Sequence, residues 1–250
     1  MIVRQTNLNL VYPKITEYRK KIVLNEDVLS EHFMPPMILP VPEQMQDEVS
    51  RVLVQTKNGH SVLNIALSVA SFATNYDGDF VNNWTKCRDY LNARCTSVYD
   101  ITSKLTDGKI IFTGLITDIE IDDCKQKGVE RLKSSLLKEN AGRLGDPYDL
   151  ACKLTYVHKE RYYINITLEN MREFDIAVNG NGREYIIGEK KHTISASVDV
   201  NDRYAANYIP DYCSDKAAFD EIMEIASDII NNKLLKLVEK GEFENDESKK

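Results

Sequence analysis

Apolar and polar residues alternate along several segments of the chain, and this alternation predicts antiparallel strands. It is clearest over residues 150–156, 162–168 and 193–200, where every second residue is apolar. Because successive side chains of a strand point to opposite faces, a period of two predicts strands with one buried and one polar face. Runs of apolar and β-branched residues predict further strands over residues 2–12, 19–24, 51–56, 61–74 and 109–121.

A second period, of three to four residues, predicts helices. Apolar residues recur at this spacing from Phe80 to Leu105 and again from Phe219 to Val238, which indicates two long helices with one apolar stripe each. A shorter helix is predicted over residues 129–139. Asn58-Gly59, between two of the predicted strands, indicates a hairpin with a type I′ turn, because that turn needs positive φ at both central positions.

The first long helix begins in a polar segment that also contains the chain's only tryptophan. Asp77 and Gly78 break the preceding strand, and Asp79, Asn82 or Asn83 can accept hydrogen bonds from the first free amides of the helix. Trp84 is then expected to pack in the first helical turn. The Asp77-x-Asp79 spacing also fits a nucleotide-sugar metal site, but no parallel α/β domain accompanies it, so the turn is the better interpretation.

The order of elements predicts an α+β fold, with antiparallel β-sheet packed by long α-helices. Strands precede a long helix twice, so two duplicated strand-strand-helix halves are expected. Four prolines between Phe33 and Glu43 indicate an extended strap outside any sheet interior. The expected organisation is an N-terminal region of strands and strap (1–45), a core (46–240) with possible halves at 46–125 and 145–240, and a disordered tail (241–250).

Composition excludes several classes of protein. The net charge of −7 argues against a nucleic-acid-binding protein, because affinity for phosphate comes from clustered lysine and arginine. No apolar run approaches the roughly 20 residues that a membrane helix needs, and the N-terminus has no signal-peptide core, so a cytoplasmic protein with no membrane partner is expected. The five cysteines form neither a C-x-x-C pair nor a disulfide framework, and no cofactor is expected.

One set of residues resembles a catalytic arrangement. Asp175, Glu189 and Lys191 have the outline of the D…E-x-K site of metal-dependent nucleases, in which two carboxylates hold a metal ion and a lysine stabilises developing charge. The motif is very short, and a strand with a charged edge explains the same residues. A nuclease or phosphoesterase is therefore kept as an alternative function.

A second acidic set lies at the end of the strand predicted over residues 109–121. Asp118, Glu120 and Asp122 follow one another at a period of two, so that their carboxylates share a face of the strand and could hold a divalent cation. Charges at this period are also what a solvated strand end shows, and that interpretation is favoured.

The remaining candidates are surfaces. Exposed sheet edges invite strand addition, and a long helix with a wide apolar stripe is suited to a homo-oligomer interface. The interaction candidates on the terminal helix are Phe219, Ile222, Ile229 and Ile230.

The segment from Val52 to Leu91, with Asn83-Trp84 opening a helix, resembles a sporadically distributed, uncharacterised family of bacterial proteins of about this length. That family has no assigned catalytic residues, so the resemblance transfers none. Its patchy distribution implies a mobile or defence-related system. The sheet-then-long-helix pattern, seen twice, also resembles a duplicated SecB-like chaperone fold.

The function expected from the sequence is a non-enzymatic cytoplasmic module that binds a protein or peptide and self-associates, in the manner of a SecB-like chaperone or a component of such a bacterial system. The alternatives are the metal-dependent nuclease and a structural subunit of a larger assembly.

Overall fold

A single antiparallel sheet organises the chain in the computed structural model, which describes residues 1–121, 127–137 and 147–241. Its nine strands have the order β2-β3-β4-β5-β1-β6-β9-β8-β7, and together with the helices they confirm the α+β class. The strands are β1 (Ile2–Val11), β2 (Met37–Ile38), β3 (Val52–Gln55), β4 (Ser61–Ile65), β5 (Val69–Asn75), β6 (Phe112–Ile121), β7 (Ala151–His158), β8 (Tyr162–Val178) and β9 (Glu184–Asn201).

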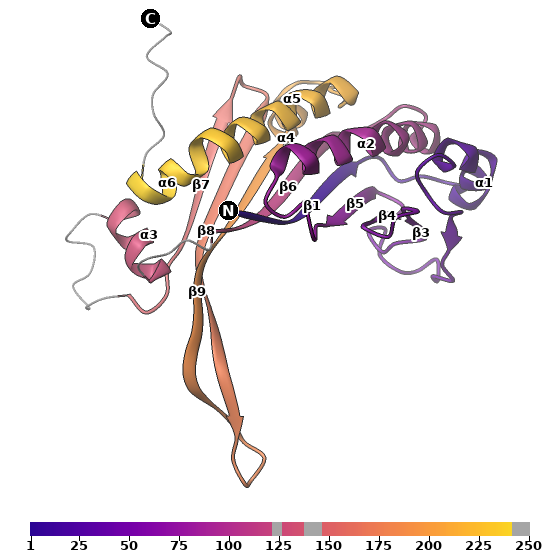
Figure 1. Ribbon diagram of the computed structural model, residues 1–250. Coiled ribbons are helices and arrows are strands. Elements are labelled where there is room, and N and C mark those ends of the chain that lie inside the picture. Colours follow the sequence, from indigo (N-terminus) through magenta and orange to yellow (C-terminus); the bar gives the residue numbers. More distant parts are fainter. Residues whose placement is uncertain (122–126, 138–146, 242–250) are drawn as a thin grey trace, which may run out of the picture.

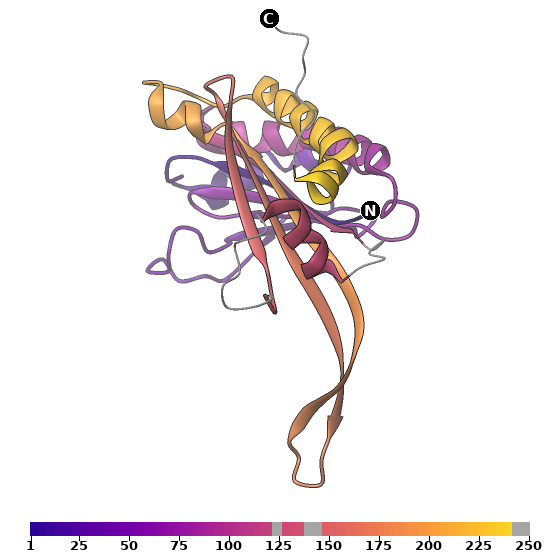
Figure 2. The ribbon, with the colours of Figure 1, turned by 90° about the vertical axis from the view of Figure 1, so that its left-hand side faces the viewer.

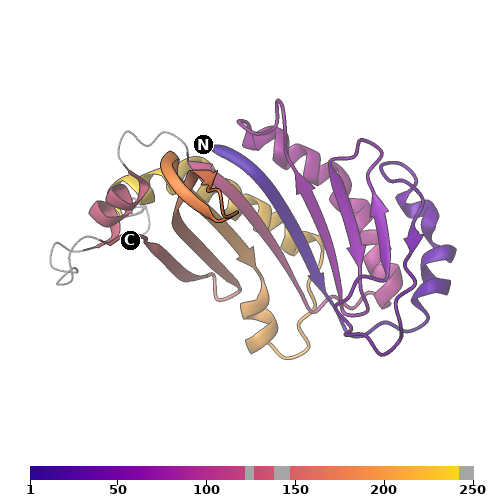
Figure 3. The same ribbon diagram turned by 90° about the horizontal axis from the view of Figure 1, so that it is seen from below.

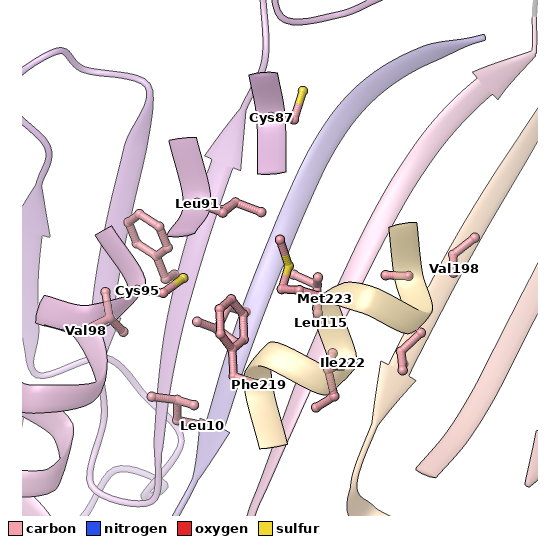
Figure 4. Packing of buried hydrophobic residues seen from close by; sticks show 14 of the residues in the cluster. Leu10, Cys87, Leu91, Cys95, Val98, Leu115, Val198, Phe219, Ile222 and Met223 are labelled. Atoms are coloured by element: carbon pink, nitrogen blue, oxygen red, sulfur yellow. The ribbon is translucent and has the colours of Figure 1, made fainter. Parts of the chain in front are cut away.

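The long helices lie side by side across one face of the sheet (Figure 1). In the core between them and the strands, Phe219 and Ile222 pack near Cys95 and Leu115 (Figure 4), and all four are fully buried. The helices are α1 (Tyr18–Leu24), α2 (Trp84–Thr106), α3 (Gly128–Leu136), α4 (Arg203–Tyr208), α5 (Lys216–Asp228) and α6 (Leu234–Lys240), with a 3-10 turn at Glu26–Leu29 and a π turn at Ile229–Lys233.

Two halves of the chain repeat the same order of elements. Each has a strand, a short helix, a three-stranded meander and a long helix: β1-α1-β3-β4-β5-α2 in the first half and β6-α3-β7-β8-β9-α5 in the second. In both halves the first strand pairs with the last strand of the meander. Strands β1 and β6 then pair antiparallel with each other, with Thr6 opposite Thr117, so a pseudo-twofold axis passes between the halves.

This topology corrects the expected domain boundaries. Residues 1–45 are not a peripheral region, because β1 is the middle strand of the sheet. Strand β6 opens the second half and does not close the first, so the halves do not divide as 46–125 and 145–240. The proline-containing segment contributes only the short edge strand β2. The end of the expected tail, residues 242–250, lies outside the described residues.

Two strand predictions were wrong. Residues 19–24 belong to helix α1, in which only Ile22 is buried, so a basic segment needed just one apolar anchor to fold beside α2. Residues 61–74 form two strands, because the chain reverses at Ala66–Ser68 and Ile65 pairs with Ala70. The two strands are therefore neighbours in the sheet.

Positive φ at two consecutive turn residues was expected in one hairpin and occurs in another. At Asn58-Gly59 only Gly59 has a positive φ, and its amide donates to the Thr56 carbonyl, so the turn is not type I′. Positive φ at two consecutive residues occurs instead at Lys159 and Glu160, between β7 and β8. The strand pairing there holds both residues in a conformation that neither favours.

The predicted start of the first long helix is confirmed. Gly78 has a positive φ, and the Asn83 side chain accepts a hydrogen bond of 3.1 Å from the Lys86 amide as the helix N-cap. Trp84 is buried, and its indole Nε1 donates to Ser227 Oγ on α5 at 2.9 Å. Asp77 lies 3.6 Å from His60 Nδ1 at the end of the neighbouring hairpin.

We expect Asn83→Ala to lower the free energy of unfolding by about 1 kcal/mol, because it leaves the Lys86 amide without its acceptor. Urea denaturation at neutral pH measures this change. Asn82→Ala is the matched control, since Asn82 is an exposed neighbour outside the cap, and it should change stability by less than about 0.5 kcal/mol. Equal losses in both variants would contradict the assigned cap.

Candidate interaction surface

The most prominent surface feature is a β-ribbon that extends beyond the sheet. We call residues 171–192, the distal parts of β8 and β9, the arm; Figures 1 and 2 show it projecting away from the helices. Strand β7 pairs with β8 only as far as Glu169, and β6 pairs with β9 only as far as Ile194. Among the described strands none pairs with the arm, so within that part of the chain neither of its edges has a strand partner.

Comparison of the halves shows that the fold does not require the arm. The pairing registers place β4 and β5 where β8 and β9 lie in the second half. The first half makes this connection with the short turn Ala66–Ser68, whereas the second half inserts the whole arm. The arm is therefore an addition to a unit that closes without it.

One face of the arm carries a cluster of apolar residues. Ile176 pairs with Ile186, and Phe174 and Val178 lie two residues to either side of Ile176 on the same face, opposite Glu189 and Glu184. Ile176 is 58% exposed, Ile186 59% and Val178 63%. We call Phe174, Ile176, Val178 and Ile186 the apolar arm face. The opposite face carries Asp175, Ala177, Tyr185 and Gly188.

The apolar arm face lies on the same side of β8 as the core. The buried Ile166 and Leu168 share the alternation of Phe174 and Ile176, and the polar Asn170 and Arg172 separate the two apolar pairs. Beyond the helix layer, Phe174 is half-buried, and Ile176 and Val178 are exposed. The alternating apolar residues at the distal end of β8 are therefore exposed to solvent.

Ion pairs fix the root of the arm. Arg172 donates from Nη1 to Glu189 Oε1 at 3.1 Å and pairs through Nη2 with Asp149 at 3.2 Å. Its guanidinium carbon lies 3.8 Å from the ring centroid of Tyr148. His192 Nε2 lies 2.8 Å from the second oxygen of Glu189. These contacts hold the base of the arm in one position.

A second set of ion pairs joins the root to the middle of the sheet. Glu120 on β6 accepts hydrogen bonds from Lys191 on β9 and from Arg4 on β1. Burial alone would raise the pKa of Glu120, but the hydrogen bonds from Lys191 and Arg4 outweigh it and hold the pKa of this carboxyl below its usual value.

The residues of the expected D…E-x-K site have separate surroundings. Glu189 contacts Arg172 and His192, whereas Lys191 contacts Glu120. Asp175 is opposite Gly188, one pair along from Glu189 opposite Phe174, so the two carboxylates stand on opposite faces of the ribbon.

The second acidic set lies on the sheet face away from the helices. Asp118 is opposite Ser197, and Glu120 is opposite Ser195. The third residue of that set, Asp122, lies outside the described residues. Within residues 1–121, 127–137 and 147–241, no group of three or more His, Cys, Asp or Glu is placed to hold a metal ion.

The interaction residues expected on the terminal helix are in the core instead. Phe219, Ile222, Ile229 and Ile230 are all buried within this chain. Their stripe packs on the sheet and on α2, so it is not available as a surface. This prediction was wrong because an apolar stripe on a helix reports that the stripe is buried, without reporting whether the cover comes from the same chain.

The described cysteines are free thiols. Burial raises the pKa of Cys87 to about 12, and Cys95 is fully buried with its pKa raised for the same reason. Both thiols stay protonated at neutral pH, which fits packing residues and not activated nucleophiles.

The sequence contained a signal for the arm that its interpretation missed. Apolar residues flank the Asn179–Gly182 turn on both sides, in a region with no helix nearby in the chain. The same residues also fit an ordinary hairpin, in which both strands pack on the body of the protein. Their mixture of apolar and charged neighbours is the signal that marks an uncovered strand.

Comparisons with known proteins identify no family for the chain. No family model matches it, and no curated protein does. Among solved structures, the di-domain ARO/CYC StfQ from the steffimycin biosynthetic pathway is similar at 7% identity and a TM-score of 0.21, over 94% of this chain and 96% of that one. A TM-score this low carries no argument. The resemblances to the bacterial family and to SecB-like chaperones stay predictions.

The helices give no sign of a membrane-spanning segment: none of those in the described residues has the length and apolar character to cross a bilayer.

The ion pairs of Glu120 predict a dependence of stability on pH. A carboxyl whose pKa is lowered by folding stabilises the protein at pH values above its pKa in the unfolded chain, which is near 4.5. That stabilisation is lost as the pH falls through the pKa of the folded state. We therefore expect Glu120→Gln to be less stable than the parent at pH 7 and to lose less stability between pH 7 and pH 3. Urea denaturation at the two pH values measures both.

Asp118→Asn is the control for this experiment, because Asp118 is on the same strand and face but outside these ion pairs. It should keep the parent's loss of stability on acidification. If Glu120→Gln lost as much stability as the parent, the ion pairs would not contribute to folding.

Proposed function

We propose that this protein acts by binding another polypeptide chain, and that the arm is the element that makes the contact. The observation that carries the proposal is the apolar arm face, which leaves Ile176, Val178 and Ile186 more than half exposed at the end of a ribbon that the fold does not need. Exposed apolar surface of this kind marks interaction sites.

The shape of the arm supports a protein partner over a small ligand. Small molecules bind in concave sites that enclose most of their surface. The arm is a projecting ribbon, and it offers two edges that no described strand occupies, as well as the apolar arm face. Another chain can use both, by adding a strand to an edge and by covering the apolar side chains.

A cytoplasmic location is part of this proposal. Four free cysteines are described, including two buried thiols that could not pair without disrupting the core. Unpaired cysteines of this kind fit a reducing compartment. The proposal needs no cofactor, because binding rather than catalysis is the activity.

Shortening the arm tests this function. Replacing residues 174–188 with the turn Asn-Gly keeps Arg172, Glu189 and Lys191 at the root. We expect the intact chain, gently purified, to be found in a complex with polypeptide by native mass spectrometry, and the shortened chain to be found as a monomer. A complex counts as support only if it re-forms from separated components with the intact chain and not with the shortened one.

Urea denaturation controls for the fold, since the shortened chain keeps the ion pairs of the root and should unfold cooperatively. Complexes that survive shortening of the arm would contradict the proposal. So would an intact chain that is monomeric in every preparation.

A further inference from the structure

We infer that the partner of the arm is an extended polypeptide strand with alternating apolar and basic side chains, and that it pairs with the outer edge of β8 between Glu173 and Val178. This inference rests on the proposed function and specifies the segment that the arm binds. Three features of the arm support it: the regularity of its β8 edge, the length of that edge that no described strand occupies, and the side chains that alternate along it.

Only one edge of the arm is suited to pairing with a regular strand. The register between β8 and β9 shifts twice in the arm, and on both occasions the extra residue lies in β9, at Ile187 and at Lys190. A β-bulge bends and twists its own strand, and this twist turns the edge of that strand away from a new partner. The outer edge of β9 is therefore irregular, whereas β8 contributes one residue to each pair and keeps the spacing of an ordinary strand.

The outer edge of β8, which faces away from β9, already has a strand partner closer to the body. Strand β7 pairs antiparallel with it as far as Glu169, and the Asn170 amide donates to the Leu150 carbonyl. From Glu173 onward no described strand pairs with this edge, and the arm projects from the sheet on the side away from the helices (Figure 3). The segment from Glu173 to Val178 has about the length of an ordinary strand. A partner strand bound there would continue the line of β7.

An added strand would also complete the ribbon. A two-stranded hairpin is marginally stable in water, and three or more strands with an apolar face form a more stable unit. Beyond its root the arm has only two strands. When a strand adds to a sheet edge, its main-chain hydrogen bonds supply affinity and its alternating side chains supply specificity. The side chains of β8 therefore determine which strand fits.

One face of the β8 edge favours apolar side chains in the partner. Phe174, Ile176 and Val178 follow one another at a period of two on this face. Side chains directly opposite each other in an antiparallel pair are in contact, so apolar residues at every second position of the partner would cover these three. The acidic residues of the same face, Glu184 and Glu189, belong to β9 and lie one strand further from the partner.

The other face of the same edge favours basic side chains. It carries Glu173 and Asp175, which are both exposed and form no ion pair with a described residue. Lys191 is opposite Glu173 but donates to Glu120 instead. Opposite charges across a strand pair are stabilising and like charges are destabilising, so lysine or arginine is favoured at the alternate positions of the partner. The net charge of −7 also attracts a basic segment to the chain.

Charge distinguishes the two edges of the arm as well. Residues 173–178 of β8 contain two acidic residues and no basic residue. Residues 183–191, which return along β9, contain three basic and two acidic residues. A basic strand is therefore attracted to the edge of β8, which is the edge that the bulges leave regular.

Synthetic peptides of about eight residues, long enough to span this edge, test the inference. One alternates isoleucine with lysine, and the other alternates isoleucine with glutamate. In fluorescence anisotropy titrations with the full chain, the lysine peptide should bind at least about 10-fold more tightly than the glutamate peptide, because its charges face Glu173 and Asp175. The chain in which Asn-Gly replaces residues 174–188 should bind neither peptide. Equal binding of the two peptides to the full chain would overturn the inference.

Reversing the charge of the edge should exchange this preference. When Glu173→Lys and Asp175→Lys are combined, the glutamate peptide should become the tighter ligand, a gain that a damaged fold does not produce. Glu43→Lys combined with Glu48→Lys is the matched control, because it makes the same change in net charge at exposed residues outside the arm. The control should keep the preference for the lysine peptide. If the two double variants behaved alike, the assignment to the edge of β8 would be overturned.

A third peptide tests whether the partner binds as a strand. It has the composition of the lysine peptide, but its lysines and isoleucines are grouped at opposite ends, so that it cannot present an apolar and a basic face when extended. We expect it to bind at least about 10-fold more weakly than the alternating peptide. Equal affinities would show that charge and apolar content suffice, and would overturn strand pairing.

The outcomes separate this inference from the proposed function. A chain that forms an arm-dependent complex with another polypeptide, but binds the three peptides alike, would overturn the alternating strand and leave the proposed function standing. A chain that forms no arm-dependent complex and binds none of the peptides would overturn both. A preference for the lysine peptide that persists after the arm is shortened would place the binding elsewhere, and would also overturn this inference.

Discussion

The antiparallel pairing of β1 with β6 is the contact on which the rest of the structure depends. It joins two half-sheets into one continuous sheet, with Thr6 opposite Thr117 at its centre. Because the sheet is continuous, α2 and α5 lie next to each other and share a core, in which the rings of Tyr99 and Phe219 are 5.7 Å apart. At the other end of α2, the hydrogen bond from the Trp84 indole to Ser227 joins the same two helices. Each half thus buries its helix partly against the other.

Departures from the pseudo-symmetry show where the second half has acquired something of its own. Equivalent strands pair in equivalent registers, yet one half turns at Ala66–Ser68 and the other extends into the arm. The ion pairs of Arg172 and Glu120 belong to this extension, since they stiffen its root and tie it to the centre of the sheet. A ribbon anchored in this way positions its apolar end at a defined place relative to the body.

Local patterns predicted the parts of the fold that local physics determines. The alternation over β7 to β9 and the Asn83 cap before Trp84 were visible because each depends on neighbours in the chain. Helix α1 was missed because one buried residue, Ile22, gives no periodicity. The central place of β1 depends on partners far away in sequence. The arm was not predicted, and the buried stripe of Phe219 was predicted as a surface, for the same reason. A sequence pattern tells which side of an element is apolar, and only the tertiary structure tells what covers that side.

The position of β1 has a consequence for biosynthesis. In the growing chain β1 can pair with β5 as soon as residue 75 has left the ribosome, whereas the opposite edge of β1 waits for β6, which begins only at Phe112, after the whole of α2. Until then the nascent unit presents an open strand edge over a partly uncovered core. The β6 of a neighbouring nascent chain fits that edge as well as its own does, so crowded synthesis on one messenger favours domain-swapped products, and slow release of the second half prolongs the exposure.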